Sequence, residues 1–406
     1  MSDTGSKRRR ESLGALRERE FRLLFTGQLI SLLGDAFTSI ALAWAVLAIG
    51  TATDLGIVFA AKSVPLVTFL LAGGVFADRL PRRSVMLAAD VARLGSQGAT
   101  AALVLAHSAQ VWELAALQVL AGTATAFFNP ASTGLTPMTV SEERLQQANA
   151  LRGISMSSTG LVGLAAGGAV VTLAGAGWAL AIDAASYGAS AYFLSRLRLP
   201  AHVPLEPQSF LGDLRDGWRE FAARTWVWVV VLAASVGNMF SAFFAVLGAV
   251  VSKASLGGAL AWTVILGGLA AGQIAGGVVA LRVRVRHPLS FGSALLAFFG
   301  LPLALLALRA PATVVAAGAF LSGLGNMVFN SLWETTLQRH VPPAVLSRVS
   351  AYDWFGSLAF QPLGLAIAGP CAAAIGTSTT LWLAAAGTLA TAVMCIATPS
   401  VRAVTA

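Results

Sequence analysis

The sequence predicts an all-α membrane protein whose twelve transmembrane helices form two pseudo-symmetric six-helix bundles. Three observations predict this fold class: an extreme apolar composition, long apolar runs between basic loops, and a repeat shared by the two halves of the chain. Of the 406 residues, 56% are hydrophobic and only 11% are charged, whereas a soluble protein carries about 25% charged residues. This composition excludes a cytosolic enzyme, a disordered chain and a secreted disulfide scaffold.

The apolar runs are expected to be helical, because open strands would leave backbone donors unpaired in lipid. A run of about 20 residues is long enough to cross a bilayer. The first run begins near Leu23 and continues to Ile49, which is too long for the apolar part of a signal peptide, so we expect it to be retained. The predicted spans are 23–49, 55–77, 84–106, 111–136, 147–173, 177–196, 225–251, 257–281, 288–308, 312–337, 348–374 and 378–399.

The basic residues predict which side of the membrane each loop faces. If the N-terminus is inside, most of the 27 lysines and arginines precede the first span or follow even-numbered spans, as they do in the cytoplasmic segments of membrane proteins. We therefore expect a multi-pass protein of the cell inner (plasma) membrane with both termini cytoplasmic. The net charge of +9 then reflects topology, so the lipid bilayer is an expected partner and nucleic acid is not.

A repeat relates the two halves of the chain. Gly73–Ala77 (GGVFA) resembles Gly276–Ala280 (GGVVA), and Phe128-Asn129 aligns with Phe329-Asn330 at nearly the same offset. Shared helix-packing composition is one explanation, and two bundles related by an axis along the membrane normal are the other. The predicted parts are a basic cytoplasmic N-terminus (1–22), an N-terminal bundle (23–198), a cytoplasmic linker (199–224) with a short amphipathic helix or an ordinary connector, and a C-terminal bundle (225–406).

The segment after the second span carries the most specific motif, which reads Gly73-Gly74-Val75-Phe76-Ala77-Asp78-Arg79-Leu80-Pro81-Arg82-Arg83. It resembles the signature loop of the major facilitator superfamily, although Pro81 occupies the place of the usual second glycine. The segments Phe21–Asp35 and Leu346–Ser350 are similar to the macrolide-efflux and siderophore-exporter branch of the drug:proton antiporters in that superfamily. The resemblance covers nearly the whole chain and implies the superfamily's two-bundle fold.

The resemblance also implies that this segment is a gating motif. Asp78 would face the start of the eleventh helix, where the N-terminal end of a helix favours a carboxylate. The basic residues of the motif would pair with inner acids such as Glu142, Glu143 or Asp353, and the alternative is that they serve only the charge bias of inner loops. The gating residues expected on this basis are Gly73, Gly74, Asp78, Arg79, Arg82, Arg83 and Asp353.

Polar side chains recur on one side of several predicted spans. A carboxylate at depth in the membrane costs at least ~2.5 kcal/mol, and polar residues spaced three or four apart share a helix face. The superfamily resemblance implies that the first, fourth, seventh and tenth spans line a central cavity, and these spans carry such stripes. The substrate-cavity candidates are Gln28, Ser31, Thr38, Gln118, Thr125, Asn129, Asn238, Asn326, Asn330 and Trp333.

Two acids are the proton-coupling candidates. Asp35 lies near the middle of the first span, and a buried carboxyl can bind and release a proton as a cavity opens to each side; the alternative is a hydrogen-bonded structural acid. Glu334, towards the inner end of the tenth span, is a candidate for cation binding, for a second proton site or for a water-filled vestibule. Asp90 and Arg93 lie three apart and are expected to neutralise one another.

Several chemistries have no motif in this sequence. There is no Walker A sequence, no His-Glu-x-x-His, no Gly-x-Ser-x-Gly and no Cys-x-x-Cys, so neither ATP hydrolysis nor a known type of catalytic site is expected. We therefore expect no enzyme activity, no cofactor and no metal.

The sequence and the resemblance together predict a secondary active transporter. The expected activity is export of an amphipathic small molecule, a drug or secondary metabolite, by proton antiport with alternating access, as in multidrug resistance. The expected partners are a small-molecule substrate and protons, and the chain is expected to be monomeric. The alternatives are a lipid, lysolipid or nutrient transporter of the same fold, or a non-transporting membrane receptor.

Overall fold

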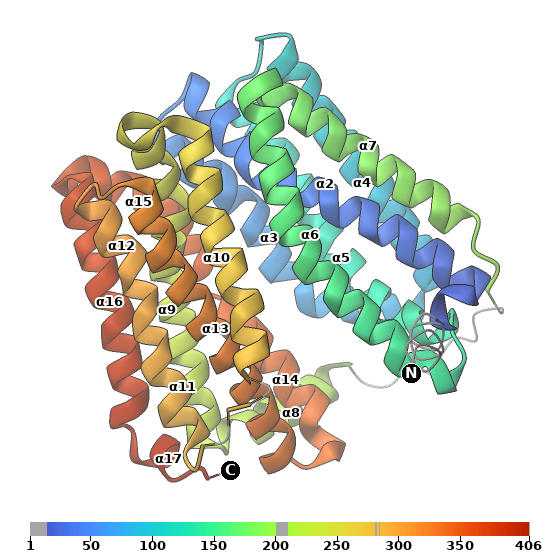
Figure 1. The fold of residues 1–406 in the computed structure, drawn as a ribbon. Helices are drawn as coiled ribbons and strands as arrows, with labels where there is room; N and C mark the ends of the chain where they lie inside the picture. The colour runs from blue at the N-terminus through green and yellow to red at the C-terminus, as the bar shows by residue number, and fades with distance from the viewer. Residues whose placement is uncertain (1–13, 200–209, 281, 284, 406) are drawn as a thin grey trace, which may run out of the picture. The chain divides into compact units, whose positions relative to one another are not determined.

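The structure is a computed structural model that describes residues 14–199, 210–280, 282–283 and 285–405. These residues form helices joined by short turns, and the part of the chain described contains no β-strand (Figure 1). Nine of the described helical segments are long and apolar enough to cross a membrane. The all-helical prediction is therefore confirmed for these residues, and the total of twelve crossings stays a prediction.

The N-terminal half contains six long helices, each of which lies over one predicted span. Thr51 and Asp54 start the second of them with a capping box: Asp54 N–H donates to Thr51 Oγ1 (3.3 Å), and Thr51 N–H donates to Asp54 Oδ2 (2.7 Å), which satisfies donors that a helix start leaves unpaired. The elements are η1 (Gly14–Arg17), α2 (Arg19–Ile49), α3 (Ala52–Arg79), α4 (Arg82–Leu105), α5 (Val111–Leu135), η2 (Thr136–Met138), η3 (Glu142–Arg144), α6 (Leu145–Ala174) and α7 (Ala176–Ser195).

The C-terminal half begins with a short helix within the predicted linker and continues through further long helices. The elements are α8 (Phe210–Ala222), α9 (Thr225–Val251), η4 (Ser252–Leu256), α10 (Gly258–Ala280), α11 (Pro288–Leu296), η5 (Ala297–Phe299), α12 (Gly300–Ala307), α13 (Ala312–His340), α14 (Pro343–Leu358), α15 (Gln361–Ile375), α16 (Thr377–Ala397) and α17 (Pro399–Arg402). The ninth and eleventh predicted spans are thus each interrupted, at η5 and between α14 and α15.

Prolines explain both interruptions. Pro302 and Pro362 cannot donate a backbone hydrogen bond to the carbonyl four residues earlier, which disrupts a helix at that point. At the second break, α9 satisfies freed backbone groups: Ser235 Oγ accepts from the Phe360 N–H (3.3 Å), and Asn238 Nδ2 donates to the Ser357 carbonyl (2.9 Å). Two polar side chains of α9 therefore stabilise the bend next to them.

By their internal contacts the residues group into two compact units. The N-terminal unit takes in the described residues within 1–42, 68–109 and 116–206, and the C-terminal unit takes in those within 43–67, 110–115 and 207–406. The segment 43–67, which includes the start of α3, thus belongs with the C-terminal unit, whereas the sequence places it in the N-terminal bundle. The predicted bundle boundaries stay a prediction.

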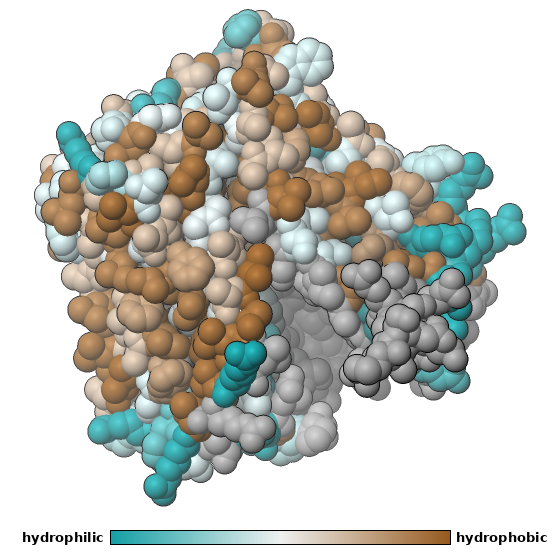
Figure 2. All heavy atoms as spheres, in the orientation of Figure 1, coloured by the Kyte–Doolittle hydropathy of each residue, from teal (hydrophilic) through white to brown (hydrophobic). Residues whose placement is uncertain are grey.

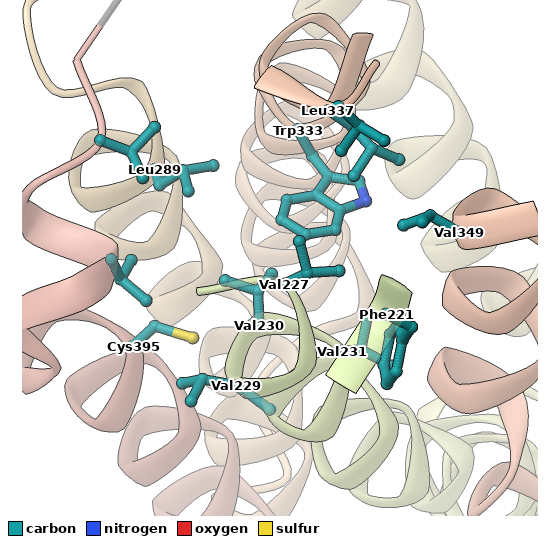
Figure 3. Packing of buried hydrophobic residues seen from close by; sticks show 14 of the residues in the cluster. Phe221, Val227, Val229, Val230, Val231, Leu289, Trp333, Leu337, Val349 and Cys395 are labelled. Carbon is teal, nitrogen blue, oxygen red and sulfur yellow. The ribbon is translucent and has the colours of Figure 1, made fainter. Parts of the chain in front are cut away.

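Each unit has an apolar interior and an apolar surface. In the N-terminal unit, Leu24, Met86 and Phe128 are among the buried residues of one core cluster. In the C-terminal unit, Figure 3 shows Val227 of α9 beside the Trp333 ring of α13, within another cluster. Large apolar side chains are also exposed on the surface, where Figure 2 shows hydrophobic residues over much of the visible face. Lipid contact accounts for this exposure.

Helices α10 and α13 of the C-terminal unit approach each other through glycines. Gly268, Gly272 and Gly276 follow one another at four-residue intervals. A Cβ on any of them would overlap a backbone carbonyl oxygen of α13. Small residues at this spacing allow helix backbones to pack closely in membranes. Helix α10 therefore has a specific glycine face that packs against α13, although its composition is apolar throughout.

Candidate functional site

A buried polar cluster, here called the acid network, joins four helices of the N-terminal unit. Its members are Asp35 and Thr38 of α2, Asp90, Arg93 and Gln97 of α4, Gln118 of α5, and Asp183 and Tyr187 of α7.

Helices α2 and α7 each present one acid and one hydroxyl to the other. The Tyr187 hydroxyl donates to Asp35 Oδ1, and the Thr38 hydroxyl donates to Asp183 Oδ2 (2.5 Å). Residues three or four positions apart share a helix face, so the two pairs form a reciprocal contact between successive helical turns. Gly34 permits the close approach, because a Cβ there would overlap the Ser186 hydroxyl and lie 2.7 Å from Asp183 Oδ1.

Two glutamines extend this contact to α4 and α5. Gln97 Nε2 donates to Asp183 Oδ2 (2.7 Å) and to Thr38 Oγ1 (2.9 Å), and Gln118 Nε2 donates to Gln97 Oε1 (3.1 Å). Asp183 and Gln118 are completely buried. A carboxylate without solvent requires hydrogen-bond donors. The Gln97 amide and the Thr38 hydroxyl donate to Asp183 Oδ2, and Gln118 holds the Gln97 amide in place.

Arg93 is the basic member of the acid network. It forms the expected ion pair with Asp90, whose side chain is fully buried. The Arg93 guanidinium carbon also lies 4.0 Å from the ring centroid of Phe128 and 4.5 Å from that of Tyr187, and aromatic faces attract a cation. Since Tyr187 contacts both Arg93 and Asp35, its ring connects the ion pair to the acid on α2.

The other predicted polar residues of this unit lie outside the acid network. Gln28 Nε2 donates to Ser132 Oγ (2.6 Å), which also accepts from Arg152 Nη2 (3.1 Å). The Thr125 hydroxyl donates to a carbonyl of its own helix. Ser31 is buried, and Asn129 is exposed.

The gating motif is described only in part. The surroundings of Gly73 and Gly74 and the side chains of Asp78 and Arg79 lie outside what the structure describes, although the backbone of all four belongs to α3. Arg82 Nη1 donates to the Gly134 carbonyl (2.7 Å).

Arg83, in the first turn of α4, binds the C-terminal end of α7. Its Nε donates to the Leu194 carbonyl (2.9 Å) and its Nη2 to the Ser195 carbonyl (2.5 Å). The last carbonyls of a helix lack partners and favour a cation. The described contacts of Arg83 are thus with a helix end, and the pairing of the motif's basic residues with acids stays a prediction.

The C-terminal unit contains a pocket of about 740 Å³, here called the C-terminal pocket. Residues of α9, α11, η5, α13, α14 and α16 line it. Six of the sequence candidates meet there, namely Asn238, Asn326, Asn330, Trp333, Glu334 and Asp353. Its volume lies within the range of small-molecule sites.

Hydrogen bonds hold several of these pocket residues in place. Trp333 Nε1 donates to Asp353 Oδ2 (2.9 Å), and Ser357 Oγ donates to Asp353 Oδ1 (3.3 Å). Asn330 Nδ2 donates to Asn326 Oδ1 (2.6 Å). The Trp333 ring lies nearly parallel to a neighbouring phenylalanine, with centroids 6.5 Å apart and an interplanar angle of 9°. One wall of the pocket is therefore rigid and polar.

Sequence reasoning missed three members of the acid network. Gln97 of α4 and Asp183 and Tyr187 of α7 are not among the candidates predicted from the sequence. The four-residue spacing of Asp183 and Tyr187, together with Ser186 and Ser190, was the signal that could have identified a polar face there. In the part of the chain that the structure describes, no group of three or more His, Cys, Asp or Glu side chains could hold a metal ion.

Comparisons with known proteins agree with this architecture. The multidrug efflux pump Tap of Mycobacterium tuberculosis is 25% identical, over 94% of each chain, and Tap of Mycolicibacterium fortuitum is 27% identical, over 91% of this chain and 93% of that one. A crystal structure of a POT family transporter has the same fold, with a TM-score of 0.73 at 10% identity, over 93% of this chain and 96% of that one. A family model described as transmembrane secretion effector matches residues 10–405. The chain therefore belongs to this transmembrane secretion effector family, within the major facilitator superfamily.

Proposed function

We propose that this protein exports an amphipathic small molecule across the inner membrane in exchange for protons. Family membership and the two relatives named multidrug efflux pumps support export. Two separate polar sites, the acid network and the C-terminal pocket, support a division of labour in which one binds protons and the other binds the substrate. No enzymatic step is part of this proposal.

The observation that carries the proton coupling is the charge balance of the acid network. Its described members include three carboxyl groups and one basic side chain, Arg93, which pairs with Asp90. Asp35 accepts a hydrogen bond from the neutral Tyr187 hydroxyl, and the described members of the network therefore hold more carboxyl groups than basic groups. An uncompensated carboxylate inside the membrane is expensive, and binding a proton removes that charge.

Asp35 is the member best suited to exchange protons with water. It is partly exposed, whereas Asp183 and Asp90 are completely buried. The Tyr187 hydroxyl orients its carboxyl. Asp35 would therefore take up a proton on one side of the membrane and release it on the other, while Asp183 keeps α2 and α7 in register.

Alternating access would link the two sites. Transporters built from two related halves open to one side at a time by movement of one half against the other. The proton gradient would drive the cycle, and the membrane potential adds about 2.3 kcal/mol per charge per 100 mV. In this proposal the chain works as a monomer with both termini in the cytoplasm. Asp78 and the basic residues of the gating motif stabilise either the inward-open or the outward-open state.

Transport by purified protein in liposomes tests the proposal. We use Hoechst 33342 as the substrate and a trapped pH-sensitive dye as the proton reporter. An imposed pH gradient should drive Hoechst movement, and Hoechst movement should in turn move protons. Asp35→Asn should abolish the coupling between Hoechst movement and proton movement. Glu113→Gln, which changes a partly exposed acid in the first turn of α5 outside the acid network, should preserve that coupling. Equal proton-linked transport by Asp35→Asn would refute the assignment of Asp35.

A further inference from the structure

We infer that the C-terminal pocket binds an organic cation, with Glu334 and Asp353 as its counter-charges. This inference rests on the proposed function, because it names the substrate class of the pocket assigned there. It also chooses among the three roles that the sequence left open for Glu334.

The first argument is the charge of the pocket. Among its described lining residues, Glu334 and Asp353 are the ones with ionisable side chains, and both are acids. Neither takes part in an ion pair with another residue in the described part of the chain. Asp353 is partly buried, and a carboxylate withdrawn from water without an opposite charge is unfavourable. Among the described residues the pocket offers no positive partner for its two acids, and a bound cation would supply one.

The second argument is how Asp353 is held. Its two carboxyl oxygens accept hydrogen bonds from Trp333 Nε1 (2.9 Å) and Ser357 Oγ (3.3 Å). Both donors are neutral, so they fix the orientation of the carboxylate and leave its charge uncompensated. Groups fixed in advance in this way bind a ligand with little reorganisation.

The third argument is that Glu334 is available. It follows Trp333 directly and lies four residues after Asn330 on α13, so it continues the same polar stripe. Its side chain is exposed to the pocket and makes no hydrogen bond to the residues that the structure describes. As far as the described residues go, the carboxylate of Glu334 is therefore open to hydrogen bonding and ion pairing with a ligand.

The remaining lining favours an organic cation over an inorganic one. Phe299, Phe329, Trp333 and Trp354 contribute aromatic rings, and Met327 contributes an adaptable thioether. Aromatic faces bind organic cations, and methionine packs against irregular apolar shapes. A volume of about 740 Å³ is far larger than a single metal ion requires, and the described residues hold no metal-binding cluster.

Equilibrium dialysis with the purified full chain tests the inference. The probe is tetraphenylphosphonium, whose charge is permanent, and the matched neutral compound is triphenylphosphine oxide. We expect the neutral compound to bind at least about tenfold more weakly. Glu334→Gln and Asp353→Asn should each weaken tetraphenylphosphonium binding by about tenfold, as expected for a lost interaction with a charged group, and should leave binding of the neutral compound unchanged.

Two controls keep the result specific. Glu113→Gln removes a partly exposed acid in the first turn of α5, outside the pocket, and should bind the probe as the wild type does. Glu334→Gln breaks no described contact, so it tests the inference even if Asp353→Asn fails to fold. Competition by Na⁺ but not by K⁺ would instead assign the carboxylates to an inorganic cation and overturn the inference.

The inference is also overturned if the probe does not bind, if the neutral compound binds equally well, or if Glu334→Gln leaves binding unchanged. Failure of the proposed function gives a different result. Charge-dependent probe binding by a protein that shows no proton-linked Hoechst transport in liposomes would reject proton antiport and leave the cation pocket standing.

Discussion

Replacing Arg93 by glutamine removes the basic member of the acid network and leaves Asp90 without its ion pair. The side chains of Arg93 and Asp90 are only 4% and 0% exposed, so water cannot replace the lost partner. Breaking a buried ion pair by removing one partner costs about 3–5 kcal/mol. The guanidinium also loses its contacts with the rings of Phe128 and Tyr187, each worth about 0.5–2 kcal/mol. We therefore expect Arg93→Gln to lower the free energy of unfolding by at least about 3 kcal/mol.

The double variant Asp90→Asn/Arg93→Gln is the critical comparison. It removes both charges, and a neutral pair leaves no isolated carboxylate in the interior, so we expect it to be clearly more stable than Arg93→Gln alone. Acidic pH should narrow the gap, because a proton can then neutralise Asp90 in the single variant. Arg196→Gln is the matched control: Arg196 also lies over a tyrosine ring, 5.1 Å from the centroid, but it is exposed, so its loss should cost about 0.5–1 kcal/mol at most.

Reversible unfolding in mixed detergent micelles, followed by tryptophan fluorescence, measures these differences. A loss of less than about 1 kcal/mol for Arg93→Gln, or a double variant as unstable as the single one, would refute the argument that the ion pair neutralises a buried charge. Equal behaviour of Arg93→Gln and Arg196→Gln would refute the role of burial.

Two further predictions concern packing and proton coupling. Gly272→Ala should sharply reduce the yield of folded protein, because a Cβ there would overlap the Phe320 carbonyl. Gly267→Ala is the control: a Cβ there would meet no atom within 4 Å, so this variant should be tolerated. Size-exclusion profiles of detergent extracts compare the two variants, and similar profiles would contradict the close approach of α10 and α13. Tyr187→Phe keeps the ring over Arg93 but removes the hydroxyl that donates to Asp35. The free energy of unfolding should fall by about 1–3 kcal/mol at most, while the pH dependence of Hoechst transport should shift. An unchanged pH profile would show that Tyr187 takes no part in proton coupling.

Several features of the fold were predictable from the sequence because they depend on local composition. Among the described residues, each predicted span lies on one α-helix or on two consecutive α-helices. The interruptions at Phe299 and Phe360 were not predicted, although Pro302 and Pro362 are plain in the sequence. Proline in a membrane helix produces a break or a mere bend depending on whether neighbouring helices satisfy the freed backbone groups, and the sequence does not show these neighbours.

The candidate sites also contain some features that local sequence predicts and others that depend on how the helices pack. The four-residue spacing of Asn326, Asn330 and Glu334 placed them on one face of a helix, and the structure brings that face into the C-terminal pocket. The proximity of Asp353 to Trp333 depends on how α13 and α14 pack, and no local pattern encodes it.

The sequence by itself determined that the chain is helical, rich in segments suited to lipid, and supplied with polar residues on particular helix faces, because hydropathy and helical periodicity act over a few neighbouring residues. Only the tertiary structure decided that Asp35 meets Tyr187 and that Thr38 meets Asp183. Those partners lie far apart in the chain, and the rotation of each helix that brings them together is set by side-chain packing, including the space left by Gly34.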